Sequence, residues 1–410
     1  MVSLQEAIKL VSEKSKPLSI EKSDIIESLH KVLAEDIKAG FNIPSFDRAA
    51  MDGYAIYSQN TINASKQSPV ILEVKGEIKA GDTKIPKLQK GTAISIMTGA
   101  PLPIGCDCVI NKELVKPQEE KIKIFMPVES GRNIAYTAED VKKGQTIIKK
   151  GTLIDSCVFS MLAYLGKSKV KVYKKPVVAI LSTGNEIKKP GQPLSKYSVY
   201  DSNTYTFYSL TLKNGGIPKI LGIASDEHAS LDKFIKKGLG HDILLLSGGI
   251  SAGKYDWVAD VLMKNGVKMI FWKIAMKPGK PIFFGIKGKT LVFGLGGYPL
   301  AAYIGFLTIV KPALQKISGI QHDTDITIPA YFKGNIENKT DKDNVILVKL
   351  IEEKDKITAI PSVQEDSCPS HYSQRSSLLS LTLKSNGLFF LKKGETKKEG
   401  DIILVHLLEK

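Results

Sequence analysis

Cysteine is scarce in this chain, and its placement gives no basis for a structural zinc site. The 410 residues contain four cysteines, at positions 106, 108, 157 and 368. Cys106 and Cys108 form a Cys-x-Cys pair, but a zinc site needs a second pair of ligands at a matching spacing, and the sequence has none. We therefore expect both cysteines to be small buried or turn residues that remain reduced.

Long apolar runs are also missing from the sequence. No stretch approaches the roughly 18 apolar residues that a membrane-spanning helix requires. Residues 1–17 have an amphipathic helical pattern instead of the charged and then apolar pattern of a signal peptide. The hydrophobic content of 43% and the charged content of 24% are typical of a soluble globular protein. We expect a cytoplasmic protein without a membrane partner.

Arginine is nearly absent, although the chain is strongly basic. The net charge is +16, yet Arg48, Arg132 and Arg375 are the only arginines. The lysines are spread along the chain without a basic arm, and aromatic residues are not interleaved with them as on a nucleic-acid platform. We expect solvated lysine faces and no nucleic-acid partner. The positive charge would still steer small anionic substrates toward a cleft.

The pattern of the chain changes several times along its length, and 410 residues suggest about two to four domains. Up to about residue 40, apolar residues recur every three and four positions, which predicts two helices. Short alternating runs from 69 to about 127 predict a small β-domain. From 174 onward strands alternate with helices, which predicts a doubly wound parallel sheet. After about 320 the pattern is β-rich again, typical of a small barrel or sandwich.

A segment near the middle of the chain, from His241 to Val258, combines a buried strand, a glycine-rich turn and the start of a helix. Backbone N–H groups at such a helix start bind phosphate, because glycine allows close approach and the helix dipole favours an anion. Gly248 to Lys254 also fits the P-loop pattern, but Tyr255 stands where a P-loop needs a hydroxyl to hold Mg²⁺. The alternative is a glycine-rich strand-to-helix turn that binds no ligand and is needed only for the path of the chain.

Residues that could bind a ligand follow directly after three of the predicted strands. Thr183 to Glu186, Asp226 and the 247–256 loop each come directly after a strand, and ligands of doubly wound sheets lie at the carboxyl ends of strands. We therefore expect these residues to meet at one edge of the sheet. Fifteen residues beyond the loop, the segment 271–281 brings three lysines close together in sequence (Lys273, Lys277 and Lys280), which predicts an oxyanion site.

Several long motifs occur in an order that identifies a family. The sequence resembles the MoeA/gephyrin E-domain family of molybdenum cofactor biosynthesis, and the similarity covers the first 320 residues before it weakens. The motifs are SFDRAAMDGYA (45–55), IMTGAPLPIGCDCVI (96–110), GRNIAYTAED (131–140), SxGxE (182–186), VYDSN (199–203), SGGISAGKYD (247–256) and WKIAMKPGKP (272–281).

The resemblance implies a multidomain α/β and β architecture in an elongated homodimer. A discontinuous helical or linker domain would comprise residues 1–41 and 142–173. A small β-domain (42–141) would complete the site across the dimer. A central doubly wound α/β molybdopterin-binding domain would span 174–320, and a C-terminal β-barrel would span 321–410.

The resemblance also implies the activity of a molybdopterin molybdenumtransferase. Adenylylated molybdopterin and molybdate combine, AMP leaves, and the dithiolene chelates molybdenum. A molybdopterin adenylyltransferase has a similar α/β domain, but the roughly 170 residues that precede that domain here argue against it. A non-catalytic dimeric scaffold of the same family is a second alternative. Other molybdenum cofactor biosynthesis proteins are possible partners.

Roles for individual residues follow from the family motifs. Glu186 and Asp226 would hold a divalent cation, Mg²⁺, because hard oxygen ligands suit that ion. The catalytic residues would be Asp52, Thr98, Asp140, Glu186, Asp226, Asp256, Lys273 and Lys277. The residues that bind the molybdopterin substrate and the oxyanion would be Thr183, Gly184, Asp201, Ser202, Asn203, Ser247, Gly248, Gly249, Ser251, Gly253, Pro278, Lys280, Lys349 and Ser380. Taken singly, Asp52 and Asp140 could equally be turn or cap carboxylates.

The sequence departs from the family pattern in two places. Tyr298 in GLGGYP (294–299) stands where the family usually has an asparagine. The C-terminal domain of the family normally supplies an arginine and a serine to molybdate. Here the matching strand offers Asn344 or Lys349, and a lysine would keep the charge but not the planar fork. A later segment offers Ser376, Ser377 or Ser380. The sequence does not separate molybdate from tungstate.

Overall fold

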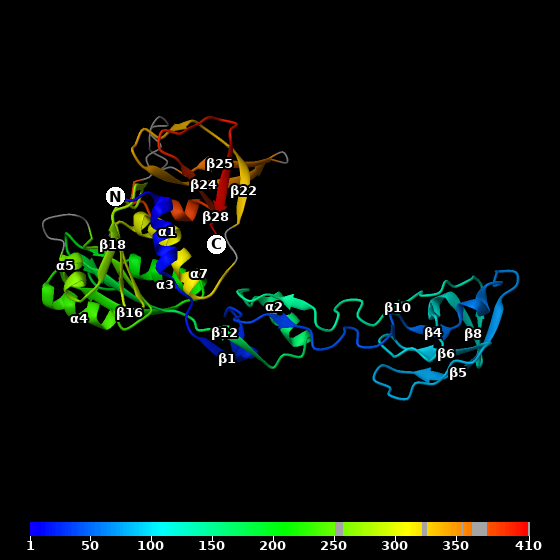
Figure 1. The fold of residues 1–410 in the computed structure, drawn as a ribbon. Coiled ribbons are helices and arrows are strands. Elements are labelled where there is room, and N and C mark those ends of the chain that lie inside the picture. The colour runs from blue at the N-terminus through cyan, green and yellow to red at the C-terminus, as the bar shows by residue number, and fades with distance from the viewer. Residues whose placement is uncertain (251–256, 322–325, 354–355, 363–374, 409–410) are drawn as a thin grey trace. The chain divides into compact units, whose positions relative to one another are not determined.

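The computed structural model describes residues 1–250, 257–321, 326–353, 356–362 and 375–408, which form two compact units (Figure 1). The inserted unit comprises Asp36–Lys149. The main unit comprises Met1–Glu35 and Lys150–Lys410, so the inserted unit interrupts it near its N-terminus.

A six-stranded sheet forms the centre of the main unit. Its order is β16 (Ile217–Ala224), β13 (Val177–Thr183), β17 (Ile243–Ser247), β21 (Thr290–Leu295), β20 (Ile282–Lys287) and β18 (Lys268–Trp272). The first four strands are parallel, whereas β20 pairs antiparallel with β21 and β18 pairs antiparallel with β20, so the predicted parallel sheet is mixed at one edge. Strands β17 and β21 are buried along their whole length, as expected for strands covered on both faces.

Helices cover both faces of this sheet, which confirms the doubly wound architecture. Successive side chains of β13 point to opposite faces: Val178 and Ile180 enter one core cluster, and Ala179 and Leu181 enter the other. The first cluster is closed by α1 (Leu4–Lys14), α3 (Asn203–Lys213), α6 (Pro299–Gly305), the π-helical turn η4 (Phe306–Val310) and α7 (Lys311–Ile317). The second is closed by α4 (His228–Gly238) and α5 (Trp257–Lys264).

Contrary to the expectation that no stretch approaches membrane-spanning length, the continuous helical segment Pro299–Ile317 is long and apolar enough to cross a membrane by length and composition alone. However, 67% of that window is buried inside the protein. Its apolar side chains, among them Leu300, Phe306 and Leu314, belong to the first core cluster. The segment is therefore a core helix of the main unit.

The first of the two predicted N-terminal helices is confirmed and the second is wrong. In α1, Leu4, Ala7 and Val11 are buried in the main core, and the Ser3 hydroxyl caps the helix by accepting the Glu6 N–H. The residues that follow instead form β1 (Ile20–Asp24), the 3₁₀ turn η1 (Ile26–Ser28) and β2 (Ile37–Lys38).

Tertiary pairing overrides the helical periodicity of this second segment. Strand β1 pairs antiparallel with β12 (Lys169–Tyr173), and its backbone groups bond there instead of within a helix. His30 has a φ of 59°, a left-handed conformation that also interrupts a helix. Close to β12 in the chain, α2 (Ser156–Tyr164) begins where Asp155 accepts the Val158 N–H.

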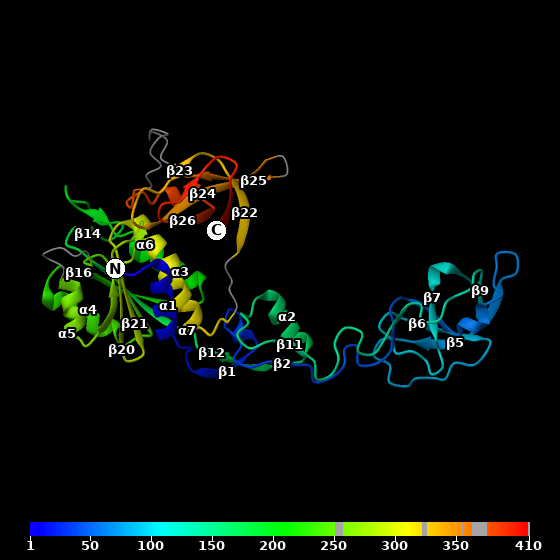
Figure 2. The ribbon, with the colours of Figure 1, turned by 45° about the horizontal axis from the view of Figure 1, so that its top comes forward.

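The C-terminal part of the main unit is a closed five-stranded barrel, which confirms the predicted β-barrel (Figure 2). The ring runs through β24 (Asp343–Glu353), β25 (Lys356–Pro361), β22 (Thr327–Phe332), β28 (Ile402–Leu407) and β26 (Gly387–Leu391), and the β24–β26 pairing closes it. In β24, Ile346 and Val348 fill the barrel, whereas Val345 and Leu347 join the α/β core. Strand β24 thus contributes side chains to both the barrel core and the α/β core.

Short elements complete the main unit. They are β14 (Ile187–Lys188), β15 (Val199–Tyr200), β19 (Met276–Lys277), β23 (Ile336–Glu337), β27 (Thr396–Lys397) and α8 (Leu381–Lys384). Strand β19 pairs in parallel with the start of β24 and so connects the segment 276–277 to the barrel.

The inserted unit is a small β-domain, as its alternating pattern predicted. Its sheet order is β7 (Cys108–Asn111), β4 (Gly53–Ile56), β6 (Thr92–Ile96), β5 (Val70–Ile78), β9 (Lys121–Ile124) and β8 (Val115–Gln118). Outside the sheet, β3 (Arg48–Ala49) pairs with β10 (Ile134–Ala135), and β2 pairs with β11 (Thr146–Ile148). Two 3₁₀ turns, η2 (Ser58–Thr61) and η3 (Lys112–Leu114), connect strands.

The two neighbouring cysteines of this unit are unreactive by environment. Cys108 is fully buried in β7, and Cys106 donates its thiol to the Cys108 carbonyl at 3.1 Å. Burial raises the pKa of the Cys106 thiol to about 11 and raises that of Cys108 as well. Both thiols are free in the structure; Cys108 is buried and Cys106 is half-buried just before β7, which agrees with the expectation of small buried or turn residues.

Candidate functional site

A cavity of about 1050 Å³ lies at the carboxyl ends of β13, β17 and β21. Residues directly after each of these strands line it: Gly184 after β13, Gly248 to Ile250 after β17, and Gly296 to Pro299 after β21. Asp226, which follows β16, lines it as well. The strand order reverses direction between β13 and β17, the place where ligands of doubly wound sheets bind. The prediction that these strand ends meet is confirmed.

Most of the site residues predicted for the α/β domain surround this one cavity. They are Thr183, Gly184, Glu186, Asp201, Ser202, Asn203, Asp226, Ser247, Gly248, Gly249, Lys277, Pro278 and Lys280. Ser251, Gly253 and Asp256 lie outside the described residues, as do the other residues of the P-loop-like segment from 251 to 256.

Two glycines shape the floor of the cavity. Gly248 has a φ of +89°, and a Cβ there would lie 2.6 Å from the Thr183 carbonyl oxygen. Gly184 has a φ of +140°, and a Cβ there would lie 2.6 Å from a carboxylate oxygen of Glu186. Both positions therefore favour glycine for conformation, and Gly248 also for space, because the atom that a Cβ would meet there belongs to the backbone.

Asp201 lines the cavity but uses its carboxylate to hold the protein together. Its oxygens accept hydrogen bonds from the Ser182 hydroxyl at 3.1 Å, the Thr204 N–H at 3.0 Å and the Thr204 hydroxyl at 2.7 Å. These bonds fix the end of β13 to the first turn of α3. Asp201 is 6% exposed, and these three hydrogen bonds occupy its carboxylate.

Asn203 connects two of the strand-end loops. Its amide Nδ2 donates to the Ser247 hydroxyl at 2.7 Å and to the Gly297 carbonyl at 2.9 Å. Its buried Oδ1 has no hydrogen-bond partner within the part of the chain that the structure describes. Buried acceptors are normally satisfied, so this oxygen is a candidate acceptor for a ligand donor.

The acidic residues of the cavity stand on two neighbouring loops. Glu186 and Asp226 are both exposed to the cavity. A reciprocal pair of hydrogen bonds joins the loops: the Asn185 N–H donates to Asp226 Oδ2 at 3.3 Å, and the Asp226 N–H donates to Asn185 Oδ1 at 3.2 Å. This pair fixes the position of the Asp226 carboxylate relative to its neighbour on the β13 loop.

The basic residues of the cavity come from two sources. Lys277 and Lys280 follow β18, whereas Lys342 comes from the turn before β24 of the barrel. Lys273 is not among the lining residues. Its ammonium lies 6.0 Å from the ring centroid of Trp272, and Trp272 donates its indole N–H to the Ile250 carbonyl at 2.8 Å.

The sequence predicted only some of the residues that line the cavity on the side of the barrel. Lys342, Ser376 and Ser377 line it, and the Leu300 N–H of α6 donates to the Ser376 carbonyl at 2.9 Å. Lys349 and Ser380 are exposed and are not lining residues. Lys342 was missed because its position depends on the pairing of β19 with β24, for which the sequence carries no local signal.

In the inserted unit, the structure brings Asp52 and Thr98 together. The Thr98 N–H and hydroxyl both donate to Asp52 Oδ1 at 2.7 Å, and the Lys112 ammonium lies 3.7 Å from Asp52 Oδ2. The Thr98 hydrogen bonds, with the Lys112 charge, hold the pKa of Asp52 below its usual value. Asp140 is exposed, and no hydrogen bond within the described ranges joins it to this pair.

The fold and the cavity define a class of protein: a multidomain α/β protein with a cavity at its strand ends that is lined by carboxylates, lysines and glycine-rich turns. Similarity to known proteins identifies the family within this class. The family described as the MoeA N-terminal region (domains I and II) matches residues 2–166, and a probable molybdopterin-binding domain matches residues 179–316.

Relatives with similar sequences and structures agree with these matches. A molybdopterin molybdenumtransferase of Bacillus subtilis is 36% identical over 319 residues, covering 77% of this chain and 74% of that one. One of Haemophilus influenzae is 35% identical over 322 residues, covering 78% of each chain. A crystal structure of a molybdopterin biosynthesis MoeA protein from Pyrococcus horikoshii has a TM-score of 0.83 and 30% identity, with full coverage of both chains. The chain belongs to the MoeA family, as its motifs predicted.

Proposed function

We propose that this protein is a molybdopterin molybdenumtransferase, which combines adenylylated molybdopterin with molybdate and releases AMP. The observation that carries the proposal is the division of charge around one cavity. Two carboxylates, Glu186 and Asp226, stand at adjacent strand ends, and three lysines, Lys277, Lys280 and Lys342, stand on other segments. A substrate that carries phosphates and meets a second oxyanion needs such a gathering of positive charge.

The proposal includes Mg²⁺ held by Glu186 and Asp226. Among the described residues, no group of three or more His, Cys, Asp or Glu side chains could hold a metal ion. Two carboxylates nevertheless fit Mg²⁺, which usually takes one or two carboxylates and completes its shell with substrate phosphates and water. The missing side chain of Gly184 keeps the space beside Glu186 open. When bound, the ion would neutralise charge on the departing adenylate.

The lysines and hydroxyls would bind the oxyanions. Lysine is a compact point charge that can pair with molybdate or phosphate without a fixed geometry. On the barrel side, the proposal relies on Lys342, Ser376 and Ser377, which line the cavity, ahead of Lys349 and Ser380, which do not. Molybdate and tungstate have nearly the same size and charge, so a competition assay of the two oxyanions would determine which of them the protein prefers.

The proposal extends to the assembly of the protein. A cytoplasmic homodimer, four domains per subunit with the boundaries given above, and contact with other cofactor-biosynthesis proteins are parts of it. In this arrangement Asp52, Thr98 and Asp140 of the inserted unit would act at the site of the second subunit. The exposed, ionised Asp52 is compatible with such a role.

An assay of AMP release tests the activity. Purified protein with adenylylated molybdopterin and Mg²⁺ should release AMP when molybdate is added and should yield active cofactor. A non-catalytic scaffold would release none, and an adenylyltransferase would consume ATP without needing molybdate. Absence of molybdate-dependent AMP release would rule the proposal out.

Asp226→Asn tests the role of the metal-binding pair. The amide keeps an acceptor for the Asn185 N–H but loses the charge, so the Mg²⁺ concentration for half-maximal rate should rise at least tenfold, and Mg²⁺ binding measured by calorimetry with substrate should weaken equally. Asp232→Asn is the matched control, since Asp232 pairs with Lys236 on α4 and is not a lining residue. Equal Mg²⁺ dependence in both variants would remove Asp226 from this role.

A further inference from the structure

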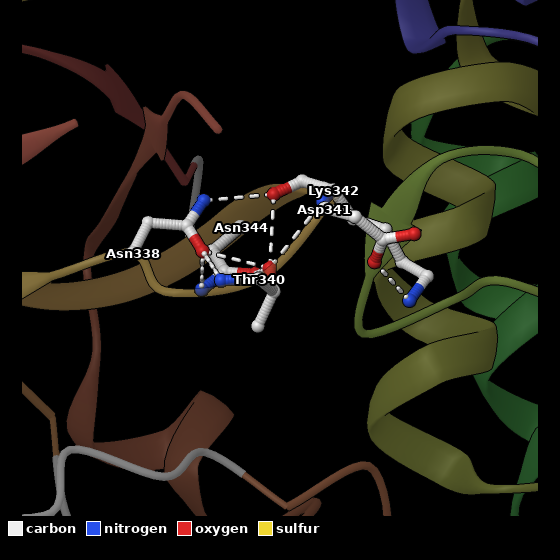
Figure 3. A network of polar contacts seen from close by, with 5 residues as sticks. All are labelled: Asn338, Thr340, Asp341, Lys342 and Asn344. Atoms are coloured by element: carbon white, nitrogen blue, oxygen red, sulfur yellow. Dashed lines mark hydrogen bonds and ion pairs between the residues drawn. The ribbon is translucent and has the colours of Figure 1, made fainter. Parts of the chain in front are cut away.

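A compact network of polar contacts stands where the barrel meets the cavity (Figure 3). It occupies residues 338–344, between β23 and the start of β24. Asn338 is 1% exposed and anchors the network. Its Nδ2 donates to the carbonyls of Leu391 at 3.1 Å and Lys392 at 3.0 Å, which fixes it to the end of β26.

The other contacts of Asn338 hold the turn itself. Its Nδ2 also donates to the Lys342 carbonyl at 2.7 Å. Its Oδ1 accepts from the Thr340 hydroxyl at 2.7 Å and from the Asn344 amide at 3.1 Å. The Thr340 hydroxyl lies 3.1 Å from the same Lys342 carbonyl. The backbone of Lys342 is thus held from two sides.

The turn is also attached to the segment that carries the other cavity lysines. Strand β19 pairs with β24 so that Met276 lies opposite Asp343 and Lys277 lies opposite Asn344. The Asp343 N–H donates to the Ala275 carbonyl at 3.1 Å. Lys342 immediately precedes these paired residues, which explains why it lines the cavity together with Lys277 and Lys280.

The charge of Lys342 already has a partner within the turn. Its ammonium lies 2.8 Å from Asp341 Oδ1, and the exposed fractions of the two side chains are 21% and 63%. The Lys342 ammonium, with a smaller contribution from Lys280, holds the pKa of the Asp341 carboxyl below its usual value. The positive charges of two cavity lysines, Lys342 and Lys280, therefore both act on the Asp341 carboxylate. An ion pair so exposed is weak and can be exchanged for a stronger anion.

We propose that Asn338 is a positioning residue for Lys342 and that Asp341 is an internal counter-ion that a substrate oxyanion displaces. Asn338, through Thr340, fixes where the Lys342 ammonium enters the cavity. Asp341 holds that ammonium until a multiply charged oxyanion binds. The inference rests on the proposed function, in which this oxyanion is molybdate or a phosphate of the adenylylated substrate.

Three variants separate positioning from charge competition. Lys342→Met should raise KM for one of the two anionic substrates about tenfold or more, because it removes a charge-assisted contact. Thr340→Val removes the hydroxyl between Asn338 and Lys342 at similar size, and should raise the same KM about threefold with kcat unchanged. Asp341→Asn should lower that KM, because it frees the ammonium. The substrate whose KM responds identifies the anion.

Two control variants and a binding measurement accompany these kinetic tests. Thr340→Ser retains the hydroxyl and should restore the wild-type KM. Lys339→Met removes one charge from the same turn, where Lys339 pairs with Glu337 and is not a lining residue, and should leave both KM values unchanged. Calorimetric titration with molybdate alone should reproduce the order of affinities if molybdate is the anion. Because Asn338→Ala leaves buried groups unpaired, its thermal unfolding is compared before its kinetics.

The outcomes are distinct from those of the proposed function. Wild-type protein without molybdate-dependent AMP release would overturn the function itself. If the wild type is active but Lys342→Met leaves both KM values unchanged, or Asp341→Asn raises KM as Lys342→Met does, the role assigned to this turn is wrong.

Discussion

Thr98 donates its backbone N–H and its hydroxyl to the same oxygen of Asp52, and both hydrogen bonds measure 2.7 Å. Thr137 makes the same two contacts with Asp47, also at 2.7 Å. In each pair, two residues that are far apart in the sequence of the inserted unit are joined by charge-assisted hydrogen bonds, which favour the ionised carboxylate. The Asp52 side chain remains 52% exposed, so its charge is available to a ligand.

Thr98→Val should raise the pKa of Asp52 toward the ordinary value near ~3.9, because valine keeps the shape and the backbone N–H but lacks the hydroxyl. A lowered native pKa stabilises the fold above the unfolded pKa, and the effect is lost as pH falls through the native value. Any stability difference should therefore appear near neutrality and vanish in acid. Carboxyl-detected NMR titration measures the shift. Thr137→Val, which affects Asp47, should leave Asp52 unchanged.

Cysteine labelling should divide the thiols by environment. Cys157 is exposed near the start of α2, whereas Cys106 and Cys108 are held protonated by burial. At pH 7 a maleimide should modify Cys157 in the native protein and spare Cys106 and Cys108, because the thiolate is the reactive form. Peptide mass mapping before and after denaturation checks this. Native labelling of Cys108 would contradict the packing of β7.

A mixed dimer should show whether the inserted unit acts across subunits. Asp52→Ala and Asp226→Ala homodimers should each be inactive. If Asp52 serves the partner's cavity, one intact site remains in each mixed dimer, and random 1:1 association should recover about a quarter of wild-type activity. Co-expression with two affinity tags isolates the mixed species. No recovery in a verified mixed dimer would place Asp52 at its own subunit's site, whereas an active Asp52→Ala homodimer would place it outside the reaction.

Leu347→Ala should destabilise the main unit by about 2–5 kcal/mol, the usual cost of truncating a fully buried leucine. Leu347 faces the α/β core from a barrel strand, so the loss should lower the unfolding midpoint of both parts together. Urea unfolding followed by fluorescence and far-UV circular dichroism measures it. Lys349→Ala on the same strand is exposed and should change stability by within about ±0.5 kcal/mol. Separate transitions for barrel and α/β core would contradict the shared core.

The predictable part of the site is the part that depends on local sequence. The apolar run ending at Ser247 and the glycines after it specify a strand and a tight turn wherever they occur. Parallel strands then bring their carboxyl ends together, which is why Glu186 and Asp226 could be placed at one edge before the structure was known.

The unpredictable part depends on pairing between distant segments. The second predicted helix overlaps β1 at its start, but β12 offers β1 a full set of backbone partners and a strand forms there instead. Lys273 is adjacent in sequence to the cavity lysines, yet its φ of +97° and its contact with Trp272 give it different surroundings. Lys342 enters the cavity only because β24 begins beside β19.

The first helix of the chain has a consequence for how the protein is made. Lys316 of α7 donates to the Ser12 hydroxyl of α1 at 2.7 Å, across a separation of 304 residues. During synthesis, α1 leaves the ribosome before α7 and finds this partner only after about three-quarters of the chain has followed it. The inserted unit has its own core and can fold in the meantime. The N-terminus must therefore wait, with its apolar face exposed, until the main unit can close around it.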